Sequence, residues 1–316
     1  MLKKLLLASV VLAMSATPSF AAGKTIAGIV FQQDMFFRSI QLGMQEEAKA
    51  NGATLLEANS DSKPEKESNL VDTFVARGVD AIIISPLSAK ASVRALQKAD
   101  EKGIKVILYN TPLDATFPVT SIGSSDRDVG QNSGRMAANL IKEKLGGTAH
   151  VAILAFKSQN PEQSGNRTGG FKDEVAKGGT VDVVAEQDAW LAEKAVAVAS
   201  DIMTAHPEVN IIYAANEGGT VGAVQAVRKA GKQGKVFVFG TDGSEQLANF
   251  LLDPDGVLVG TTAQAPVDIG RMAVKAALAS LDGKPVDKDV RVPAIPLSRN
   301  DKPAVEKFLE DAKKLK

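Results

Sequence analysis

The sequence predicts an α/β protein built from two doubly wound parallel sheets. Short apolar runs rich in β-branched residues alternate with amphipathic segments along almost the whole chain. Strands and helices that alternate in this way form parallel sheets with helices on both faces. A single parallel sheet is the alternative, but a chain near this length usually divides into two domains. The stretch SIGSSDRDVGQNSG, residues 121–134, interrupts the alternation near the middle and is the expected crossing point.

The apolar runs predict the strands one by one along the chain. Strands are expected at Thr25–Phe31, Thr54–Ala58, Ala81–Ser85, Lys105–Tyr109, Val119–Gly123, Ala149–Leu154, Val181–Ala185, Val209–Ala214, Lys235–Gly240 and Gly256–Thr261. Between them, residues 63–79 and 131–147 carry apolar residues at i, i+3 and i+4 and a glycine near the end, which predicts helices. The stretches KANGA, EKGI and RKAGKQGK are typical helix stops.

The first 21 residues are expected to be a cleaved secretory signal peptide. Lys3 and Lys4 supply a positive start, an apolar run follows from Leu5 to Met14, and Ser19-Phe20-Ala21 fits a cleavage site. The apolar run is too short to span a bilayer. We therefore expect a mature chain that begins at Ala22 and lies in a periplasm. The sequence has no cysteine, so neither a disulfide nor a lipid anchor is expected.

The charge balance argues against nucleic acid as a partner. The sequence has 37 basic and 37 acidic residues, and loss of Lys3 and Lys4 with the signal leaves 35 against 37. A protein that neutralises phosphate backbones needs a basic stripe, which this sequence lacks. The mature protein is expected to be a monomer.

Polar and planar side chains follow the predicted strands, where open parallel sheets bind ligands. The candidate ligand-binding residues are Gln32, Asp34, Phe36, Phe37, Tyr109, Asn110, Arg167, Trp190, Asn216, Asp242 and Gln264. Amides can donate to or accept from a hydroxyl group, and an arginine and an aspartate add charge-assisted hydrogen bonds. Aromatic faces can cover the C–H face of a sugar ring. The set therefore favours a neutral polyhydroxyl ligand.

Each candidate also has a structural interpretation when it is taken alone. Phe37 can belong to the core, Asp34 can cap a helix, Asp242 can serve in a turn or cap, and Arg167 can form a surface ion pair. The agreement of many strand ends favours a shared site over these separate roles.

The sequence predicts no catalytic residue, metal site or cofactor. His150 and His206 lack partners at metal-ligand spacing, and no serine lies in a G-x-S-x-G stretch. The stretch EGGTVGAV, Glu217–Val224, lacks the glycine spacing of a dinucleotide-binding turn.

Several stretches together resemble one known family. They are TIAGIV followed by DMFF, VARGVDAIIISP, LIKEKLGG, NRTGGF, MTAHPEVNIIYAANE, VFGTDGS and TTAQAPVDIGRMAV, in this order behind a signal peptide. In these stretches the chain resembles the periplasmic sugar-binding proteins of bacterial ABC importers, in the ribose-binding-protein-like group. The similarity spans about Lys24 to Gly283.

The resemblance implies the type I periplasmic binding protein fold, in which a three-stranded hinge joins two lobes. The chain would cross between lobes near Ser125, Ala265 and Val292. An N-terminal lobe of residues 22–125 plus 265–292 and a C-terminal lobe of residues 126–264 plus 293–316 are expected. Residues matching Asp34, Phe36, Phe37, Arg167, Trp190, Asn216, Asp242 and Gln264 hold the ligand between the lobes in this family, and the two phenylalanines form a stacking platform.

The chain departs from ribose binders in a way that bears on the ligand. Those proteins carry Asp-Arg where this chain has Tyr109-Asn110, and Trp190 replaces a smaller phenylalanine. A hexose, a deoxysugar, another pentose or a sugar alcohol would each fit. The resemblance also implies an ABC permease in the inner membrane as partner, and a chemoreceptor as a further candidate partner.

Three alternatives are compatible with the same layered fold. One is a receptor for another small polar ligand, such as an autoinducer, an amino acid or an amino sugar. Another is a secreted enzyme, for which Asp34, Glu217 and Asp242 are the available carboxylates. The third is the ligand domain of a transcription regulator, which would need a DNA-binding helix pair where the signal peptide stands.

Overall fold

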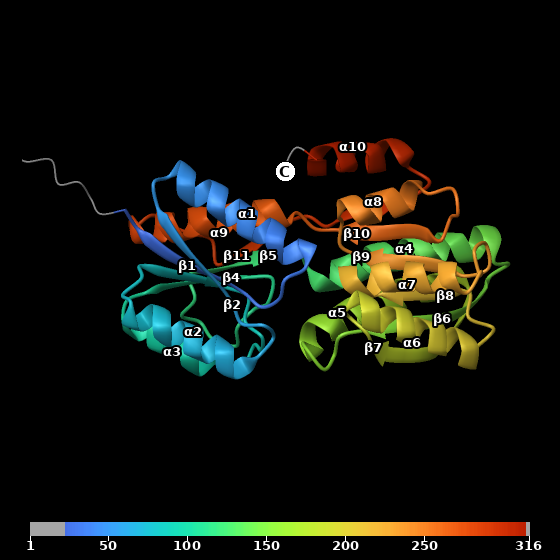
Figure 1. The fold of residues 1–316 in the computed structure, drawn as a ribbon, viewed down its shortest axis with the longest axis horizontal. Helices are drawn as coiled ribbons and strands as arrows, with labels where there is room; N and C mark the ends of the chain where they lie inside the picture. Colours follow the sequence, from blue (N-terminus) through green and yellow to red (C-terminus); the bar gives the residue numbers. More distant parts are fainter. Residues whose placement is uncertain (1–22, 314–316) are drawn as a thin grey trace, which may run out of the picture.

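Two six-stranded sheets lie side by side along the long axis of the molecule (Figure 1). The computed structural model describes residues 23–313. The first sheet has the order β11-β5-β4-β3-β1-β2, with β1 (Thr25–Val30), β2 (Thr54–Asn59), β3 (Ala81–Ile84), β4 (Lys105–Tyr109), β5 (Thr120–Gly123) and β11 (Asp289–Arg291). The second has the order β12-β10-β9-β8-β6-β7, with β6 (Thr148–Ala155), β7 (Thr180–Asp188), β8 (Ile211–Ala214), β9 (Phe237–Thr241), β10 (Leu258–Ala263) and β12 (Ile295–Ser298).

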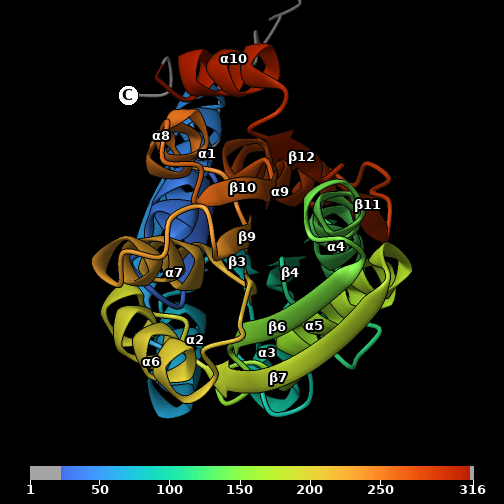
Figure 2. The same cartoon turned by 90° about the vertical axis from the view of Figure 1, so that its right-hand side faces the viewer.

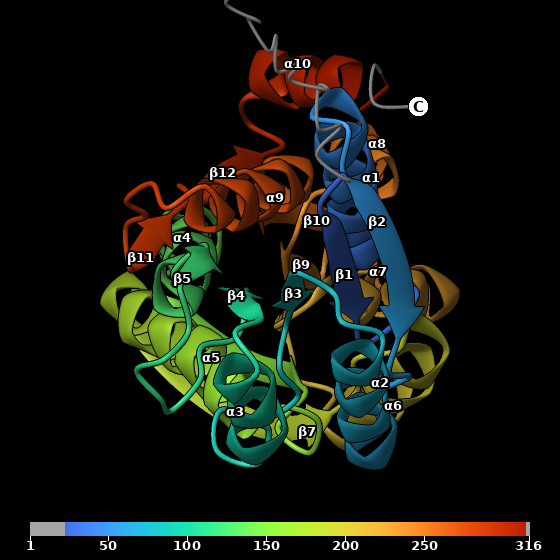
Figure 3. The ribbon, with the colours of Figure 1, turned by 90° about the vertical axis from the view of Figure 1, so that its left-hand side faces the viewer.

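Helices cover both faces of each sheet. In the first lobe, α1 (Met35–Ala50) and α9 (Pro266–Leu281) cover one face, and α2 (Pro64–Ala76) and α3 (Val93–Glu101) cover the other (Figure 3). In the second lobe, α4 (Asp126–Lys144) and α5 (Pro161–Val175) cover one face (Figure 2). The other face carries α6 (Ala192–Ala205), α7 (Glu217–Lys229), α8 (Glu245–Leu252) and α10 (Lys302–Lys313). Two doubly wound lobes confirm the predicted fold class.

Inner strands such as β1, β3 and β8 are largely apolar because both of their faces are buried. In β3, Ala81 and Ile83 pack into the core beneath α1 and α9, whereas Ile82 and Ile84 pack beneath α2 and α3. Successive side chains on a strand point to opposite faces, so a strand between two helical layers needs an unbroken apolar run. Such runs made these strands visible in the sequence.

The chain passes between the two sheets three times. Residues 124–125 lead from β5 to α4, residues 264–265 lead from β10 to α9, and residues 292–294 lead from β11 to β12. The returning helix α9 packs closely on α1, where a Cβ atom added to Gly43 would lie 2.0 Å from the carbonyl oxygen of Val267. The close helix contact fixes the returning segment to the first lobe.

The predicted strands are present, with ends that differ by a few residues, but β11 and β12 were not predicted as strands. They are short and largely exposed, and β12 contains Pro296, so neither forms an apolar run. The predicted signal peptide lies outside the described residues. Within residues 23–313, the helices are too short or too polar to cross a membrane.

Candidate functional site

The carboxyl ends of strands from both sheets meet around one small cavity between the lobes. Its volume is about 30 Å³, room for roughly two water molecules. The residues that line it are Phe31, Gln32, Asp34, Phe36, Phe37, Asn110, Phe156, Gln159, Gln163, Arg167, Asn216, Asp242 and Gln264. The structure thus brings together every predicted site residue except Tyr109 and Trp190. Each lobe and the crossing at residues 264–265 contribute to the wall.

The loop after β1 contributes a fixed carboxylate to the cavity. Asp34 caps α1, because its Oδ1 accepts a hydrogen bond of 3.0 Å from the backbone N–H of Phe37. The Gln32 amide donates to the other oxygen, Oδ2. Burial raises the pKa of Asp34 above its ordinary value, although the hydrogen bond from Phe37 opposes the rise. Asp34 therefore serves as a helix cap and as part of the wall.

Phe36 and Phe37 both face the cavity and both belong to the first-lobe core. Their rings meet edge to face, with centroids 5.3 Å apart, and Phe37 also packs on Phe31 with centroids 4.4 Å apart. Both side chains are buried in the cluster that includes Ile40 of α1. Two adjacent residues can both line the cavity and pack in the core because they lie at the start of a helix at the sheet edge. Their use as a stacking platform for a sugar remains a prediction.

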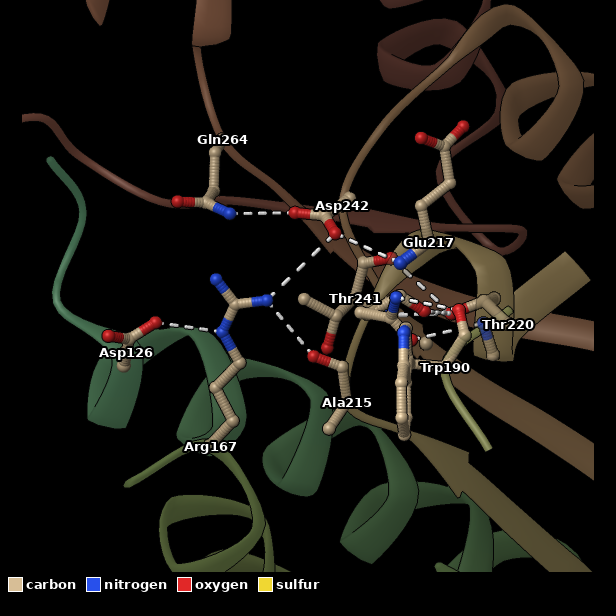
Figure 4. Close-up of polar contacts among 12 residues, drawn as sticks. Asp126, Arg167, Trp190, Ala215, Glu217, Thr220, Thr241, Asp242 and Gln264 are labelled. Carbon is tan, nitrogen blue, oxygen red and sulfur yellow. Dashed lines mark hydrogen bonds and ion pairs between the residues drawn. The ribbon is translucent and has the colours of Figure 1, made fainter. Parts of the chain in front are cut away.

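Arg167 on α5 is the central charged group of the second-lobe wall (Figure 4). Its Nε donates to Oδ1 of Asp126 at 2.8 Å, and its Nη1 donates to the carbonyl oxygen of Ala215 at 3.0 Å. The same Nη1 lies 3.9 Å from Oδ2 of Asp242. Burial alone would lower the pKa of Arg167, but Asp126 and Asp242 outweigh it and the pKa is raised. A buried guanidinium needs such partners.

Asp242, at the end of β9, links three segments of the second-lobe wall. Its Oδ2 accepts from the backbone N–H of Glu217 at 3.0 Å, and its Oδ1 accepts from Nε2 of Gln264 at 2.7 Å (Figure 4). Asp242 and Asn110 both have positive φ angles, 73° and 61°. Asparagine and aspartate adopt this left-handed conformation more readily than other L-residues, and it redirects the side chain at the end of a strand. One such residue comes from each lobe.

Two buried amide oxygens on the cavity wall lack a hydrogen-bond partner within the described chain. They are Oδ1 of Asn110, from the first lobe, and Oε1 of Gln264, from the crossing segment. A buried acceptor without a donor is destabilising by about 1–3 kcal/mol. A ligand hydroxyl that donates to either oxygen would remove this penalty.

Tyr109 and Trp190 lie in the protein framework and do not line the cavity. Tyr109 is fully buried, and its hydroxyl donates to the carbonyl oxygen of Ile29 at 2.9 Å. As the last residue of β4 it shares the inward face of Ile107, which explains its place in the core. The Trp190 ring packs on the second-lobe core, and Nζ of Lys194 lies 5.2 Å from its centroid.

Asn216 has a structural role at the start of α7 as well as a place on the wall. Its Oδ1 accepts from the N–H of Gly219 at 3.1 Å, and its Nδ2 donates to the carbonyl oxygen of Trp190 at 2.9 Å. A ligand that used this amide would share hydrogen bonds with the helix cap.

Five residues of the site were not predicted from the sequence. Phe31, Phe156, Gln159 and Gln163 line the cavity, and Asp126 holds Arg167. Phe156 and Asp126 closely follow β6 and β5, so the strand-end rule predicts them when it is applied to every strand. Gln159 and Gln163 lie further along the chain, and the sequence carries no comparable signal for them. Among residues 23–313, no group of acidic or histidine side chains is placed to hold a metal ion.

Comparisons with known proteins identify the family. The model of the periplasmic binding protein domain matches residues 27–285. The ribose import binding protein RbsB of Escherichia coli (strain K12) is 32% identical over 292 residues, which cover 90% of this chain and 95% of that protein. The D-allose-binding periplasmic protein of the same organism is 29% identical over 285 residues, 87% of this chain and 91% of that protein.

A solved structure agrees with these relatives. The periplasmic solute-binding protein of an ABC transporter from Actinobacillus succinogenes 130z, with bound D-allose, superposes with a TM-score of 0.81. It is 28% identical in sequence, and the match covers 89% of this chain and 99% of that one. The chain therefore belongs to the family of periplasmic binding proteins.

Proposed function

We propose that this protein is the sugar-binding component of an ABC importer and that it holds a neutral monosaccharide or polyol between its lobes. The observation that carries the proposal is the convergence of hydrogen-bonding groups from both lobes on one cavity, with buried acceptors at Asn110 and Gln264 that have no partner among residues 23–313. Hydroxyl groups are the donors that such acceptors need. The relatives named for ribose and D-allose support the same ligand class.

The charges of the wall favour an uncharged ligand. Arg167 is already compensated by Asp126 and Asp242. An anionic sugar would therefore face carboxylates without gaining a cation of its own. The ligand contacts that we propose are Gln32, Asp34, Phe36, Phe37, Asn110, Arg167, Asn216, Asp242 and Gln264, with Tyr109 and Trp190 behind them.

Ligand entry requires the lobes to separate. A cavity of about 30 Å³ is too small for a monosaccharide. We infer that the lobes open about the three crossing segments, admit the sugar and close over it. We propose that these segments divide the described residues 23–313 into an N-terminal lobe that runs to residue 125 and includes residues 265–292, and a C-terminal lobe of residues 126–264 and the residues from 293 onward.

The setting of this activity follows from the family, whose members are periplasmic proteins that serve transport and not catalysis. We propose that residues 1–21 are removed as a signal peptide. The mature protein would then act as a monomer and deliver the sugar unchanged to an inner-membrane permease, and a chemoreceptor is a further candidate partner.

An amino sugar is the second candidate ligand. The Arg167 guanidinium is already paired with Asp126 and Asp242, and the Asp34 carboxylate lines the same cavity outside these ion pairs. An ammonium group near Asp34 would offset part of this negative charge.

A thermal-shift screen against pentoses, hexoses, deoxysugars, polyols and amino sugars tests both candidates. A ligand that binds only the folded protein raises the unfolding temperature. We expect a rise with one or a few neutral compounds, and recovery of the compound unaltered after incubation. No rise with any compound, or chemical conversion of one, would refute the proposed function.

A further inference from the structure

The side chain of Gln159 joins the second lobe to the first. Gln159 lies in the loop between β6 and α5, and its Nε2 donates to Oε1 of Gln32 and to Oγ of Ser62, each at 3.0 Å. Both acceptors belong to the first lobe. A side-chain amide has two N–H hydrogens, so both are used across the gap between the lobes.

The first lobe presents the Ser62 hydroxyl on a strained turn. Ser62 has a φ angle of 56°, which L-residues other than asparagine and aspartate rarely adopt, and it follows Asp61, whose φ angle is 52°. The backbone N–H of Ser62 donates to the carbonyl oxygen of Phe31 at 2.7 Å. Lys66 forms an ion pair of 2.5 Å with Asp61. These contacts hold the serine in place, so the acceptor for Gln159 is set in advance.

The same contact reaches the wall of the ligand cavity. Gln32 accepts from Gln159 through Oε1 and donates through Nε2 to Oδ2 of Asp34. Asp34 in turn caps α1 at Phe37. The bridge between the lobes and the start of α1 are therefore parts of one hydrogen-bonded chain.

The neighbouring residue Asn160 shows why Gln159 is the informative position. Nδ2 of Asn160 also reaches the first lobe, at 3.4 Å from Oγ1 of Thr111. Its Oδ1, however, caps α5 by accepting from the N–H of Gln163 at 3.1 Å. Within the described chain, both side-chain hydrogen bonds of Gln159 go to the opposite lobe. Its truncation should thus affect closure without weakening a helix cap.

We propose that Gln159 is a closure latch, a positioning residue that stabilises the closed form whatever sugar occupies the cleft. This inference rests on the proposed function, because it assumes that ligand binding requires closure. The apparent affinity of a ligand scales with the fraction of protein in the binding-competent form. A residue that stabilises closure therefore changes the affinity for every sugar, whereas the residues of the cavity wall determine which sugar binds.

Binding of several sugars to Gln159→Ala tests the latch. Two hydrogen bonds are lost, so affinity should fall about fivefold to thirtyfold for every sugar, with the order of preference retained. Gln159→Glu should fall at least as far, because a carboxylate cannot donate and would face Gln32 beside Asp34. Gln233→Ala, an exposed glutamine of the same lobe, is the matched control and should bind as the wild type does.

A distance between the lobes gives a second readout that needs no ligand. The sequence has no cysteine, so probes can be attached through Lys90→Cys in the first lobe and Glu193→Cys in the second. Both positions are exposed. Without sugar, Gln159→Ala should show a longer average distance than the wild type.

The outcomes separate the latch from the proposed function. Affinities within twofold of wild type together with an unchanged distance would overturn the latch. A loss confined to one class of sugar would also overturn it, since it would mark Gln159 as a ligand contact. If no sugar binds the wild type, the proposed function fails, and the distance without ligand still decides whether Gln159 holds the lobes together.

Discussion

Nε of Arg167 lies 2.8 Å from Oδ1 of Asp126, in a pair that is almost fully buried. Asp126 begins α4 directly after the first crossing between the sheets, and Arg167 lies on α5. The pair therefore ties the crossing segment to the ligand cavity. Burial raises the pKa of Asp126, and the charge of Arg167 opposes this rise.

Arg167→Ala should weaken both sugar binding and the fold. Removal of one member of a buried pair leaves the other uncompensated, which destabilises by about 3–5 kcal/mol. The free energy of unfolding of a typical domain is about 5–15 kcal/mol, so with a stability near the middle of this range the variant should remain folded at 25 °C. We expect sugar affinity to fall at least about a hundredfold, because a charged hydrogen-bond donor is lost from a dry site. Calorimetric titration and urea unfolding measure the two effects.

Arg127→Ala is the matched control for this substitution. Arg127 lies on α4 and pairs with Asp173 on the surface, where both side chains are about half exposed. Exposed ion pairs contribute about 0–1 kcal/mol. Its affinity should equal that of the wild type, and an equal loss in both variants would contradict a special role for Arg167.

Gln264→Glu should make binding depend on pH. The amide of Gln264 donates to Oδ1 of Asp242 at 2.7 Å, so the substitution removes the donor and sets two carboxylates face to face. The nearby charge of Asp242 disfavours the charged form of the new carboxyl. We expect affinity to fall at least about tenfold at pH 8 and to fall less near pH 5, because protonation of the new carboxyl restores a hydrogen-bond donor. Titrations at both pH values, with Gln233→Glu as control, check this; a pH-independent affinity equal to that of wild type would contradict it.

Tyr109→Phe should reduce stability and leave sugar binding unchanged. The variant loses the hydroxyl that donates to the carbonyl oxygen of Ile29, and it leaves that buried acceptor unpaired. The expected loss is about 1–3 kcal/mol in the free energy of unfolding. A marked change in sugar affinity at constant stability would contradict this prediction and show that Tyr109 contributes to ligand binding.

The sequence predicts those parts of the fold and site whose pattern is local. The strand β3 can be predicted from its apolar run, because both of its faces are buried. Asp242 can be predicted as a site residue because it follows β9. The short strand β12 escapes prediction, since its pairing with β10 depends on a distant crossing of the chain. The role of Gln159 could not be predicted for the same reason, because its hydrogen-bond partners Gln32 and Ser62 lie 127 and 97 residues away in the sequence.

Tyr109 illustrates the limit of the strand-end rule. It stands at the end of β4, as the rule requires, yet its side chain points into the core and that of Asn110 points to the cavity. Side chains alternate along a strand, so a shift of one residue reverses the direction. The positive φ of Asn110 decides which neighbour turns toward the ligand, and this angle is not encoded in hydrophobic periodicity.

The buried carboxyl of Glu217 makes the stability of the protein depend on pH. Burial raises the pKa of its carboxyl from 4.5 to about 7, helped by the charges of Asp242 and Asp34 and opposed by hydrogen bonds from Ser244 and the backbone of Phe36. The folded protein holds this proton more tightly than the unfolded chain does. The contribution to stability is therefore fully present below about pH 4.5 and is lost as the pH rises to about 7, by about 3 kcal/mol in all.

Glu217→Gln isolates this contribution, because the amide stays neutral at every pH. Near pH 5 the wild-type carboxyl is protonated, so both proteins should have similar free energies of unfolding. At pH 8 the wild type carries a buried charge and the variant does not, and the variant should be more stable by up to about 3 kcal/mol. Urea unfolding at both pH values measures the difference between the two proteins, in which the titration of all other groups cancels. A difference that is constant with pH would mean that the Glu217 carboxyl ionises normally within the fold. Phe36 lies in the first lobe and Glu217 in the second. Such a result would therefore also argue against a pH-sensitive contact between the lobes through the Glu217 carboxyl and the backbone of Phe36.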